Sequence, residues 1–162
     1  MAETDTLQLL REHKFFLGMD DDHLQALAKL CQLAAYPNQT KIFEEFDRAK
    51  EVYFIVDGQI SLAICDAKGC RQISLVKEGD LMGWSPLIGR ARLYDTARTA
   101  SKVRALVFDG EELVAYCESN PNFGYEFMRR AAIVLGERLS DTRIQMLKLS
   151  GVKLPEFCIE SD

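Results

Sequence analysis

Apolar residues recur with helical spacing at both ends of the chain and alternate with polar ones between residues 41 and 109. Near the N-terminus the spacing predicts a short helix and then a second one, which begins at the acidic cluster of residues 20–22 and ends before Pro37. Acidic side chains at that position can cap the exposed backbone N–H groups of a helix. The apolar positions of the two helices are Leu7, Leu10, Phe15, Leu24, Leu27, Ala28 and Cys31.

Short β segments fill the middle of the chain. Residues 51–56 are rich in β-branched and aromatic side chains, and residues 60–65 alternate as in a strand with one buried face. Asp57-Gly58 between them predicts a hairpin, because a tight turn needs a positive φ. The later turn signals and the closing strand or pair of strands are Lys68-Gly69, Gly79-Asp80 and residues 98–108. Turns at intervals of roughly ten residues fit a small antiparallel barrel or sandwich.

A single helical turn is predicted inside this β region, over residues 83–89 (GWSPLIG). Ser85 can cap the turn, and Gly89 can end it. Pro86 suits the first helical position because its missing N–H costs nothing there. We therefore expect a short helix embedded among the strands.

A long helix is predicted from Pro121 to about Leu149, after a shorter one over residues 111–117. One apolar face, formed by Phe127, Ala131 and Val134, suffices to dock the long helix on the strands. A second face repeats as a heptad and needs another partner, and the simplest is the same helix of a second subunit. The alternative, one broad face buried within a single chain, stays open. The residues of this seam are Ala132, Leu135, Leu139, Thr142, Met146 and Leu149.

The chain of 162 residues suits a single domain in four parts. We expect N-terminal helices over residues 1–36, a β part over 37–109, C-terminal helices with the dimerisation helix over 110–150, and a tail over 151–162. Gly151 stops the long helix, and the sequence leaves open whether the tail is loose or docks on the domain.

Composition narrows the classes of function. Apolar residues make up 48% of the chain, enough for a core, and the formal net charge of −5 argues against a surface that neutralises nucleic-acid phosphates. There is no apolar run long enough to span a membrane, and the first ten residues lack the basic region of a signal peptide. We therefore expect a soluble cytoplasmic protein that binds neither nucleic acid nor membrane.

The five cysteines are scattered and form no C-x-x-C motif, which is typical of buried or half-buried thiols in a reducing cytosol. Cys65 and Cys70 differ from the rest, because they flank a predicted turn and can approach each other across a hairpin. Whether this pair is redox-active stays open.

No arrangement of residues points to catalysis. The two histidines, His13 and His23, fall in the N-terminal helices, whereas a cupin-type metal enzyme needs histidines on its strands. The segment around Ser85 begins like a nucleophile elbow, but it lacks the second glycine and its proline conflicts with that geometry. The acidic residues 20–22 are interpreted as a helix cap. We therefore expect no catalytic residue, no metal and no cofactor.

The order of elements, together with three motifs, resembles the cyclic-nucleotide-binding domain of the bacterial catabolite activator family. Residues 41–47 (KIFEEFD) look like the early motif of that fold with Phe46 in place of a glycine. Residues 53–60 (YFIVDGQI) are close to its hairpin, and residues 78–83 (EGDLMG) match the approach to its phosphate-binding cassette. The resemblance covers roughly residues 7–149. It implies a mainly β fold, an antiparallel double-stranded β-roll of jelly-roll type with N-terminal helices and a long C-terminal helix.

The resemblance also implies a ligand site, because the family binds the ligand phosphate at the N-terminus of the short helix in the roll. Free backbone N–H groups and the helix dipole favour an anion there. The expected ligand-binding residues are Gly83, Trp84, Ser85, Leu87, Ile88, Leu93 and Thr96.

Two charged contacts of the members that bind cyclic AMP are missing from this sequence. Trp84 stands where the ribose-binding glutamate belongs, and Leu93 stands where the phosphate-binding arginine precedes Thr96. The nearby arginines Arg90, Arg92 and Arg98 are candidates to replace the missing cation. Arg92 and Arg98 lie at unfavourable strand parity relative to residue 93 and Arg90 lies in the loop, so the alternative is that all three are solvated surface charges. The family's transcription factors continue into a helix-turn-helix, and the residues after Leu149 are too few for that module.

Two functions follow from these observations. The first is a non-catalytic sensor or regulatory domain with a pocket for a small anionic or nucleotide-like ligand, not specific for cyclic AMP. The alternative is a dimeric interaction scaffold that binds a regulatory protein partner and fills its vestigial pocket with its own side chains. Trp84 discriminates between them: at an open pocket mouth it can stack on a planar ligand, whereas inside the cavity it favours the scaffold.

Overall fold

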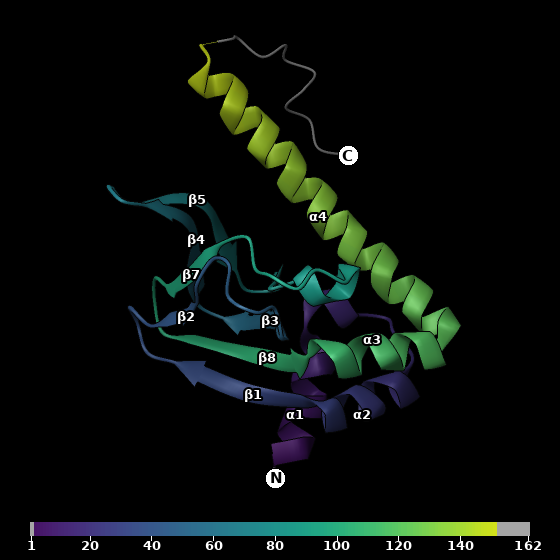
Figure 1. Cartoon of the computed structure of the whole chain (residues 1–162). Coiled ribbons are helices and arrows are strands. Elements are labelled where there is room, and N and C mark those ends of the chain that lie inside the picture. Colours follow the sequence, from purple (N-terminus) through teal and green to yellow (C-terminus); the bar gives the residue numbers. More distant parts are fainter. Residues whose placement is uncertain (1, 152–162) are drawn as a thin grey trace.

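The structure of the protein is a computed structural model that describes residues 2–151 (Figure 1). The tail over residues 152–162, for which docking was left open, lies outside the described residues. The elements in chain order are α1 (Ala2–Glu12), η1 (Lys14–Phe16), α2 (Asp21–Leu30), β1 (Cys31–Tyr36), β2 (Lys41–Phe43), β3 (Glu51–Asp57), β4 (Gln59–Asp66), β5 (Gly69–Lys77), β6 (Leu81–Met82), η2 (Ser85–Ile88), β7 (Thr96–Thr99), β8 (Val103–Asp109), α3 (Gly110–Ser119) and α4 (Pro121–Leu149).

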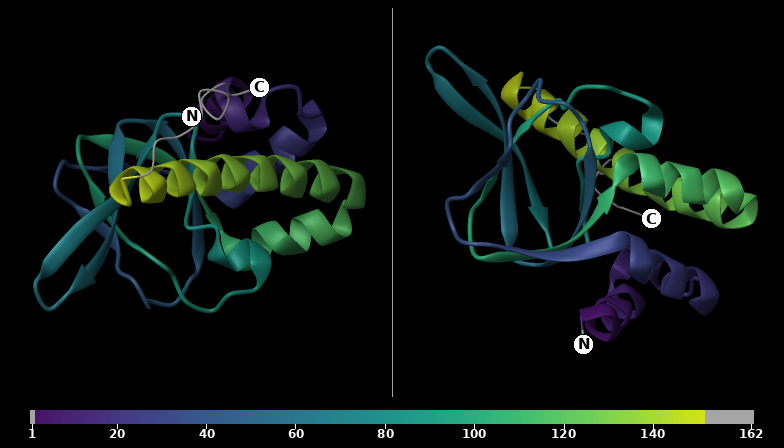
Figure 2. Two further views of the ribbon diagram at one scale, coloured as in Figure 1. Left: turned by 90° about the horizontal axis from the view of Figure 1, so that it is seen from above. Right: turned by 60° about the horizontal axis from the view of Figure 1, so that its bottom comes forward.

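Two four-stranded antiparallel sheets make up the roll, with strand orders β1-β8-β3-β6 and β2-β7-β4-β5. The helices gather at one side of the roll, and α4 runs obliquely past it (Figures 1 and 2). This arrangement confirms the mainly β, jelly-roll-like fold with N-terminal helices and a long C-terminal helix.

Strands β3 and β8 are buried on both faces, and their residues alternate between two cores. One core lies between the two sheets, and the other lies between the first sheet and the helices. Burial on both faces explains why residues 51–56 read as a continuous apolar run rather than as an alternating one. The side chains toward the helices are Val52, Phe54, Leu106 and Phe108, and those between the sheets are Tyr53, Ile55, Ala105 and Val107.

The prediction that the second helix continues to residue 36 is wrong for its last six residues. Helix α2 ends at Leu30, and Cys31–Tyr36 forms strand β1, which pairs with β8 along its whole length. Cys31 is buried in the core beneath the helices, so it continues the apolar stripe of α2 although it is already in a strand. The helical spacing of buried apolar residues therefore continues one residue beyond the end of α2. The roll begins at Cys31, before Pro37.

The hairpin predicted at Asp57-Gly58 is also wrong. Strand β3 belongs to one sheet and β4 to the other, so Gly58 turns a corner between sheets rather than joining paired strands. Its φ is +90°, and a Cβ atom there would lie 2.2 Å from the carbonyl oxygen of Lys102. Positive φ was therefore the correct inference, but close approach of another backbone segment is what requires glycine here. The turn at Lys68-Gly69 does join paired strands, β4 and β5.

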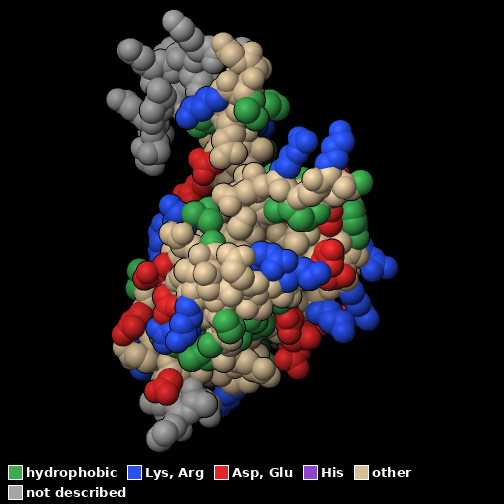
Figure 3. Space-filling view, turned by 90° about the vertical axis from the view of Figure 1, so that its left-hand side faces the viewer, with side chains coloured by type: hydrophobic (Ala, Val, Ile, Leu, Met, Phe, Trp, Pro, Cys, Tyr) green, Lys and Arg blue, Asp and Glu red, His purple; other side chains and the backbone are tan. Residues whose placement is uncertain are grey.

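Helix α4 spans the range that the sequence predicts and carries both expected faces. Phe127 and Ala131 are buried against the core, and Val134 packs on it. The heptad seam faces outward: Leu139 and Met146 are 52% and 62% exposed. A single broad face buried within the chain is therefore not what the described residues form. The C-terminal part of α4 projects beyond the roll (Figures 1 and 3).

His13 ties the turn η1 to the roll. Its Nδ1 accepts a hydrogen bond from the backbone N–H of Phe15 at 3.2 Å, and its Nε2 lies 3.0 Å from the carbonyl oxygen of Ile55. A neutral ring protonated on Nε2 satisfies both contacts. Burial lowers the pKa of His13, and the Ile55 carbonyl and the charge of Asp80 oppose this shift only in part.

Folding stability is therefore expected to fall as the pH drops below about 6.5, the ordinary pKa of histidine. The unfolded chain binds a proton there that the folded chain resists, so the free energy of unfolding decreases with falling pH and is unaffected by His13 above about pH 7.5. Urea unfolding at about pH 7.5 and 5.5 measures the effect. His13→Asn supplies a cap acceptor that does not titrate in this range, so this part of the pH dependence should disappear. An unchanged pH dependence in the variant would assign it to other groups.

Candidate ligand site

The short helix η2 lies against the start of α3, where the ring of Pro86 packs directly on Gly110. A Cβ atom on Gly110, the first residue of α3, would lie 2.4 Å from the Cβ atom of Pro86. The backbone N–H of Gly110 donates to the carbonyl oxygen of Lys50 at 2.7 Å, which fixes the same point to the start of β3. The roll and the C-terminal helices therefore position η2 together.

The expected cap of this helix is wrong in detail. Trp84, with α-helical backbone angles, occupies the cap position and makes no side-chain cap bond, whereas Ser85 is the first helical residue. The predicted end is confirmed, because Gly89 adopts φ +70°. The backbone N–H of Leu87 donates to the carbonyl oxygen of Trp84 at 3.0 Å, so it is engaged within the turn. Of the N–H groups expected to hold an anion, that of Leu87 is thus already used.

The space where the site was expected is almost closed. A cavity of about 10 Å³ remains beside η2, on the order of one water molecule. Four of the expected site residues line it, namely Gly83, Trp84, Ser85 and Leu93. Three do not: Thr96 is buried next to it, Leu87 packs toward the helical core, and Ile88 is exposed. The other lining residues are Phe43, Leu62, Tyr94, Asp95 and Arg138.

Trp84 is partly buried, and its ring stacks on a neighbouring ring rather than on open space. The centroids of Trp84 and Tyr94 are 5.3 Å apart with planes inclined by 25°. The guanidinium carbon of Arg90 lies 3.9 Å from the centroid of the Tyr94 ring. Offset stacking and a cation over an aromatic face both favour this arrangement. The tryptophan therefore helps to close the cavity with partners from its own chain.

Arg138 reaches the same cavity from α4. Its guanidinium donates a hydrogen bond to the carbonyl oxygen of Leu81, and the carboxylates of Asp80 and Asp95 attract its charge. Burial lowers the pKa of Arg138 and raises that of Asp95. The guanidinium of Arg138 therefore lines the same cavity as Leu93, which stands where the family resemblance implies an arginine.

Sequence reasoning missed Arg138, although a signal was present. Phe127, Ala131 and Val134 form the docking face of α4, and Arg138 continues their spacing of four, three and four residues. A charged residue in line with a buried apolar stripe lies over the partner surface unless it bends away. The three arginines considered in its place lie elsewhere: Arg92 and Arg98 bond exposed backbone oxygens of Phe46 and Gln39, and Arg90 covers Tyr94.

The loop after β2 borders the site and carries an unusual backbone. Phe46 adopts φ +69° with 72% of its surface exposed. Its N–H donates to the carbonyl oxygen of Leu93 at 3.0 Å, which ties the loop to the cavity wall. Glycine adopts this conformation without steric cost, which accounts for the glycine in the motif that residues 41–47 resemble.

Phe46→Gly is therefore expected to stabilise the fold by about 0.5–1 kcal/mol. Relief of the left-handed conformation, about 1–2 kcal/mol, exceeds the entropy that glycine loses on folding, about 0.5–1 kcal/mol. Phe46→Ala keeps the strained φ while removing the exposed ring, so its stability should stay close to that of the parent. Chemical denaturation of the three proteins compares them directly. A destabilised Phe46→Gly would mean that the ring makes contacts worth more than the backbone strain.

Two further findings concern the described residues alone. Within residues 2–151, no group of three or more His, Cys, Asp or Glu side chains is arranged to hold a metal ion. None of the helices in that part of the chain is long and apolar enough to cross a membrane.

Two four-stranded sheets, a short helix among the strands and a long C-terminal helix define a β-roll module of the jelly-roll type. The family model described as the cyclic nucleotide-binding domain matches residues 33–120, and the chain belongs to this family.

Relatives and solved structures agree with this assignment. The CRP-like cAMP-activated global transcriptional regulator of Mycobacterium tuberculosis is 23% identical over 154 residues, which cover 91% of this chain and 65% of the regulator. A cyclic nucleotide-binding domain from Methylobacillus flagellatus superimposes with a TM-score of 0.76 at 18% identity, covering 95% of this chain and 85% of that one. The catabolite activator protein of Thermus thermophilus superimposes with a TM-score of 0.67 at 21% identity, and the match covers 85% of this chain and 63% of that one.

Proposed function

We propose that this chain is a non-catalytic regulatory module whose roll pocket is filled by its own side chains and which acts through contacts with other proteins. The observation that carries the proposal is the cavity of about 10 Å³. Small-molecule pockets typically have volumes of about 300–1,000 Å³, so a cyclic nucleotide has no room beside Trp84 and Arg138. The relatives named above are a regulator, a binding domain and an activator protein, which accords with a regulatory rather than an enzymatic role.

A second candidate is a sensor for a small anion, and Arg138 is the observation that favours it. A guanidinium that faces the cavity can bind an anion in place of the Leu81 carbonyl if the ligand displaces Trp84 from its stack. The two candidates predict different outcomes for one substitution. Arg138→Ala abolishes binding in the sensor, because it removes the cation, whereas in the self-filled module there is no binding to abolish.

Titration of Trp84 fluorescence with cyclic AMP, cyclic GMP and inorganic phosphate tests the proposal, because Trp84 is the single tryptophan of the chain. The self-filled module predicts no saturable change up to millimolar ligand. A saturable change that Arg138→Ala removes would establish the sensor instead. Mass spectrometry of small molecules released from the protein purified out of its native host extends the test to ligands outside this set.

The module is further expected to be a homodimer through the outward seam of α4. Leu139→Glu would bury a charge in that seam, which costs several kcal/mol if the charge is desolvated, so the dimer should dissociate. Ser140→Glu adds the same charge about 100° further around the helix, outside the seam, and should leave the dimer intact. Light scattering after size exclusion at tens of micromolar distinguishes the two variants. A monomeric parent chain at that concentration would refute the dimer.

A further inference from the structure

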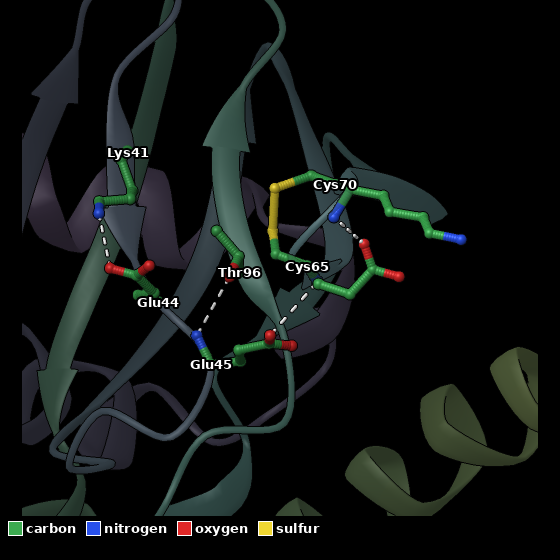
Figure 4. Close-up of a disulfide and its surroundings, with 8 residues drawn as sticks. Lys41, Glu44, Glu45, Cys65, Cys70 and Thr96 are labelled. Atoms are coloured by element: carbon green, nitrogen blue, oxygen red, sulfur yellow. Dashed lines mark hydrogen bonds and ion pairs between the residues drawn. A yellow bond between two sulfur atoms is a disulfide. The ribbon is translucent and has the colours of Figure 1, made fainter.

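The tip of the β4–β5 hairpin projects from the roll and carries two cysteines at directly opposed positions (Figure 2). Cys65 and Cys70 face each other in the strand register with Cα atoms 4.0 Å apart, and their sulfur atoms form a disulfide (Figure 4). Cys70 is exposed and Cys65 is half-buried, so a small reagent in solution can reach the bond.

The other cysteines of residues 2–151 have the opposite surroundings. Cys31 and Cys117 are buried in the core beneath the helices. Burial raises the pKa of Cys31 to about 12 and that of Cys117 to about 11, so neither forms a thiolate near neutral pH. Thiolate is the reactive form in disulfide exchange, and exchange also requires access. Thiol chemistry within the described residues is therefore confined to the hairpin tip.

The hairpin holds the two cysteines together without the covalent bond. Strands β4 and β5 pair from Gln59 opposite Lys77 to Asp66 opposite Gly69. The carboxylate of Asp66 accepts a hydrogen bond from the backbone N–H of Lys68 at 2.8 Å and closes the turn. A reduced hairpin keeps this register and leaves the two thiols opposed. The fold therefore supports both redox states, and the bond can form and break without unfolding.

The disulfide is also connected to the wall of the roll pocket. The backbone N–H of Cys65 donates to Oε1 of Glu45 at 3.3 Å, and the backbone N–H of Glu45 donates to Oγ1 of Thr96 at 3.2 Å (Figure 4). Thr96 directly follows Asp95, which lines the cavity with Trp84. The hydrogen bonds therefore run from the Cys65 backbone through Glu45 to Thr96, whose neighbour Asp95 lines the cavity.

We propose that Cys65 and Cys70 form a reversible thiol–disulfide exchange site for low-molecular-weight disulfides of the glutathione class, and that Glu45 transmits its redox state to the pocket wall. One cysteine thiolate attacks the disulfide RSSR, forms a mixed disulfide and releases one RSH after proton uptake. The second thiolate attacks the protein sulfur of the mixed disulfide and releases the second RSH. Two electrons pass from the protein thiols to RSSR, and the two thiol protons end on the two RSH molecules. The proposal does not depend on whether the pocket binds a ligand.

The exchange step is tested on the folded Cys158→Ser protein, equilibrated in glutathione buffers of increasing oxidised fraction. This substitution removes the cysteine that lies outside the described residues, so the number of alkylated cysteines refers to four known positions. Mass spectrometry should find two alkylated cysteines under reducing buffer, Cys65 and Cys70, and none under oxidising buffer, with full reversal between them. Cys65→Ser should instead stop at one glutathione adduct on Cys70. A count that does not respond to the glutathione ratio, or that responds only after denaturation, overturns the proposal.

Trp84 fluorescence tests the connection to the pocket. The emission of the folded protein should differ between the oxidised and reduced states, and Glu45→Ala should at least halve this difference while leaving the exchange itself intact. Glu44→Ala is the matched control, because the carboxylate of Glu44 pairs with Lys41, whereas that of Glu45 accepts from the hairpin (Figure 4). An emission that is identical in both states, or a difference that Glu45→Ala leaves unchanged, overturns the connection.

Discussion

Trp84→Glu combined with Leu93→Arg is expected to tighten cyclic AMP binding by roughly 10²–10⁴-fold over the parent chain, which should bind in the millimolar range or more weakly. Each charge-assisted contact to the ligand contributes about 1.5–3 kcal/mol, so the two together supply about 3–6 kcal/mol, and about 1.4 kcal/mol corresponds to a tenfold change. Leu93 lines the cavity beside η2, so we expect an arginine at this position to reach the space where the family resemblance implies the ligand phosphate. Isothermal titration of both proteins with cyclic AMP measures the gain.

The structure adds a condition to this prediction, because Arg138 and Trp84 occupy the space that a nucleotide needs. Trp84→Glu removes the ring itself, and Arg138→Ala in the same background should increase affinity further if the guanidinium obstructs the pocket. Ile88→Glu with Leu93→Arg is the control: Ile88 is exposed outside the cavity, so the added carboxylate cannot reach the ribose. No binding by any of these variants would mean that the walls of the roll, and not two side chains, close the pocket.

Phe54→Ala is expected to destabilise the fold by about 3–5 kcal/mol, a large part of the 5–15 kcal/mol typical of a whole domain. Phe54 is fully buried at the centre of an aromatic cluster, with ring centroids 4.7–6.1 Å from those of four other phenylalanines. These come from η1, β8 and α4, so one truncation loosens the packing of three elements on the sheet. Those phenylalanines are Phe15, Phe16, Phe108 and Phe127.

Chemical denaturation with Ile64→Ala as the control measures this effect. Ile64 also lies on a strand but is 51% exposed, so its truncation should change the free energy of unfolding by less than about 1 kcal/mol. Equal losses in the two variants would show that the aromatic cluster does not carry the packing between helices and sheet.

The sequence predicts those features that depend on a repeating pattern. The predicted bounds of helix α4 agree with the observed ones, Pro121–Leu149, because its apolar spacing of three and four residues persists over many turns. The boundary between α2 and β1 was missed because Cys31 is buried both as the continuation of a helical stripe and as the first residue of a strand. Periodicity reports which side of an element is buried, and it cannot separate two elements that bury their side chains in the same core.

The contents of the pocket were harder to predict than its position. The motif placed Gly83, Trp84, Ser85 and Leu93 at the cavity, but Arg138 arrives there from a helix more than forty residues further along the chain. Its contact depends on how α4 crosses the roll, which is a tertiary property. The pairing of Cys65 with Cys70 was suggested by the turn at Lys68-Gly69, because a hairpin fixes which residues face each other. What the sequence does not contain is the link from that pair through Glu45 to Thr96.

Two of the three glycines in α3 and α4 lie where neighbouring elements leave no room for a side chain. Gly110 brings α3 directly against Pro86 of η2, and a Cβ atom on Gly124 of α4 would lie 2.4 Å from the carbonyl oxygen of Cys117 in α3. Gly110 packs on the rigid ring of Pro86 and Gly124 packs on the backbone of Cys117, so neither contact has a flexible side chain that can absorb a displacement. The three helices are therefore in direct contact, from η2 through α3 to α4. The helix beside the cavity and the helix that carries the outward seam are joined with little room for movement between them.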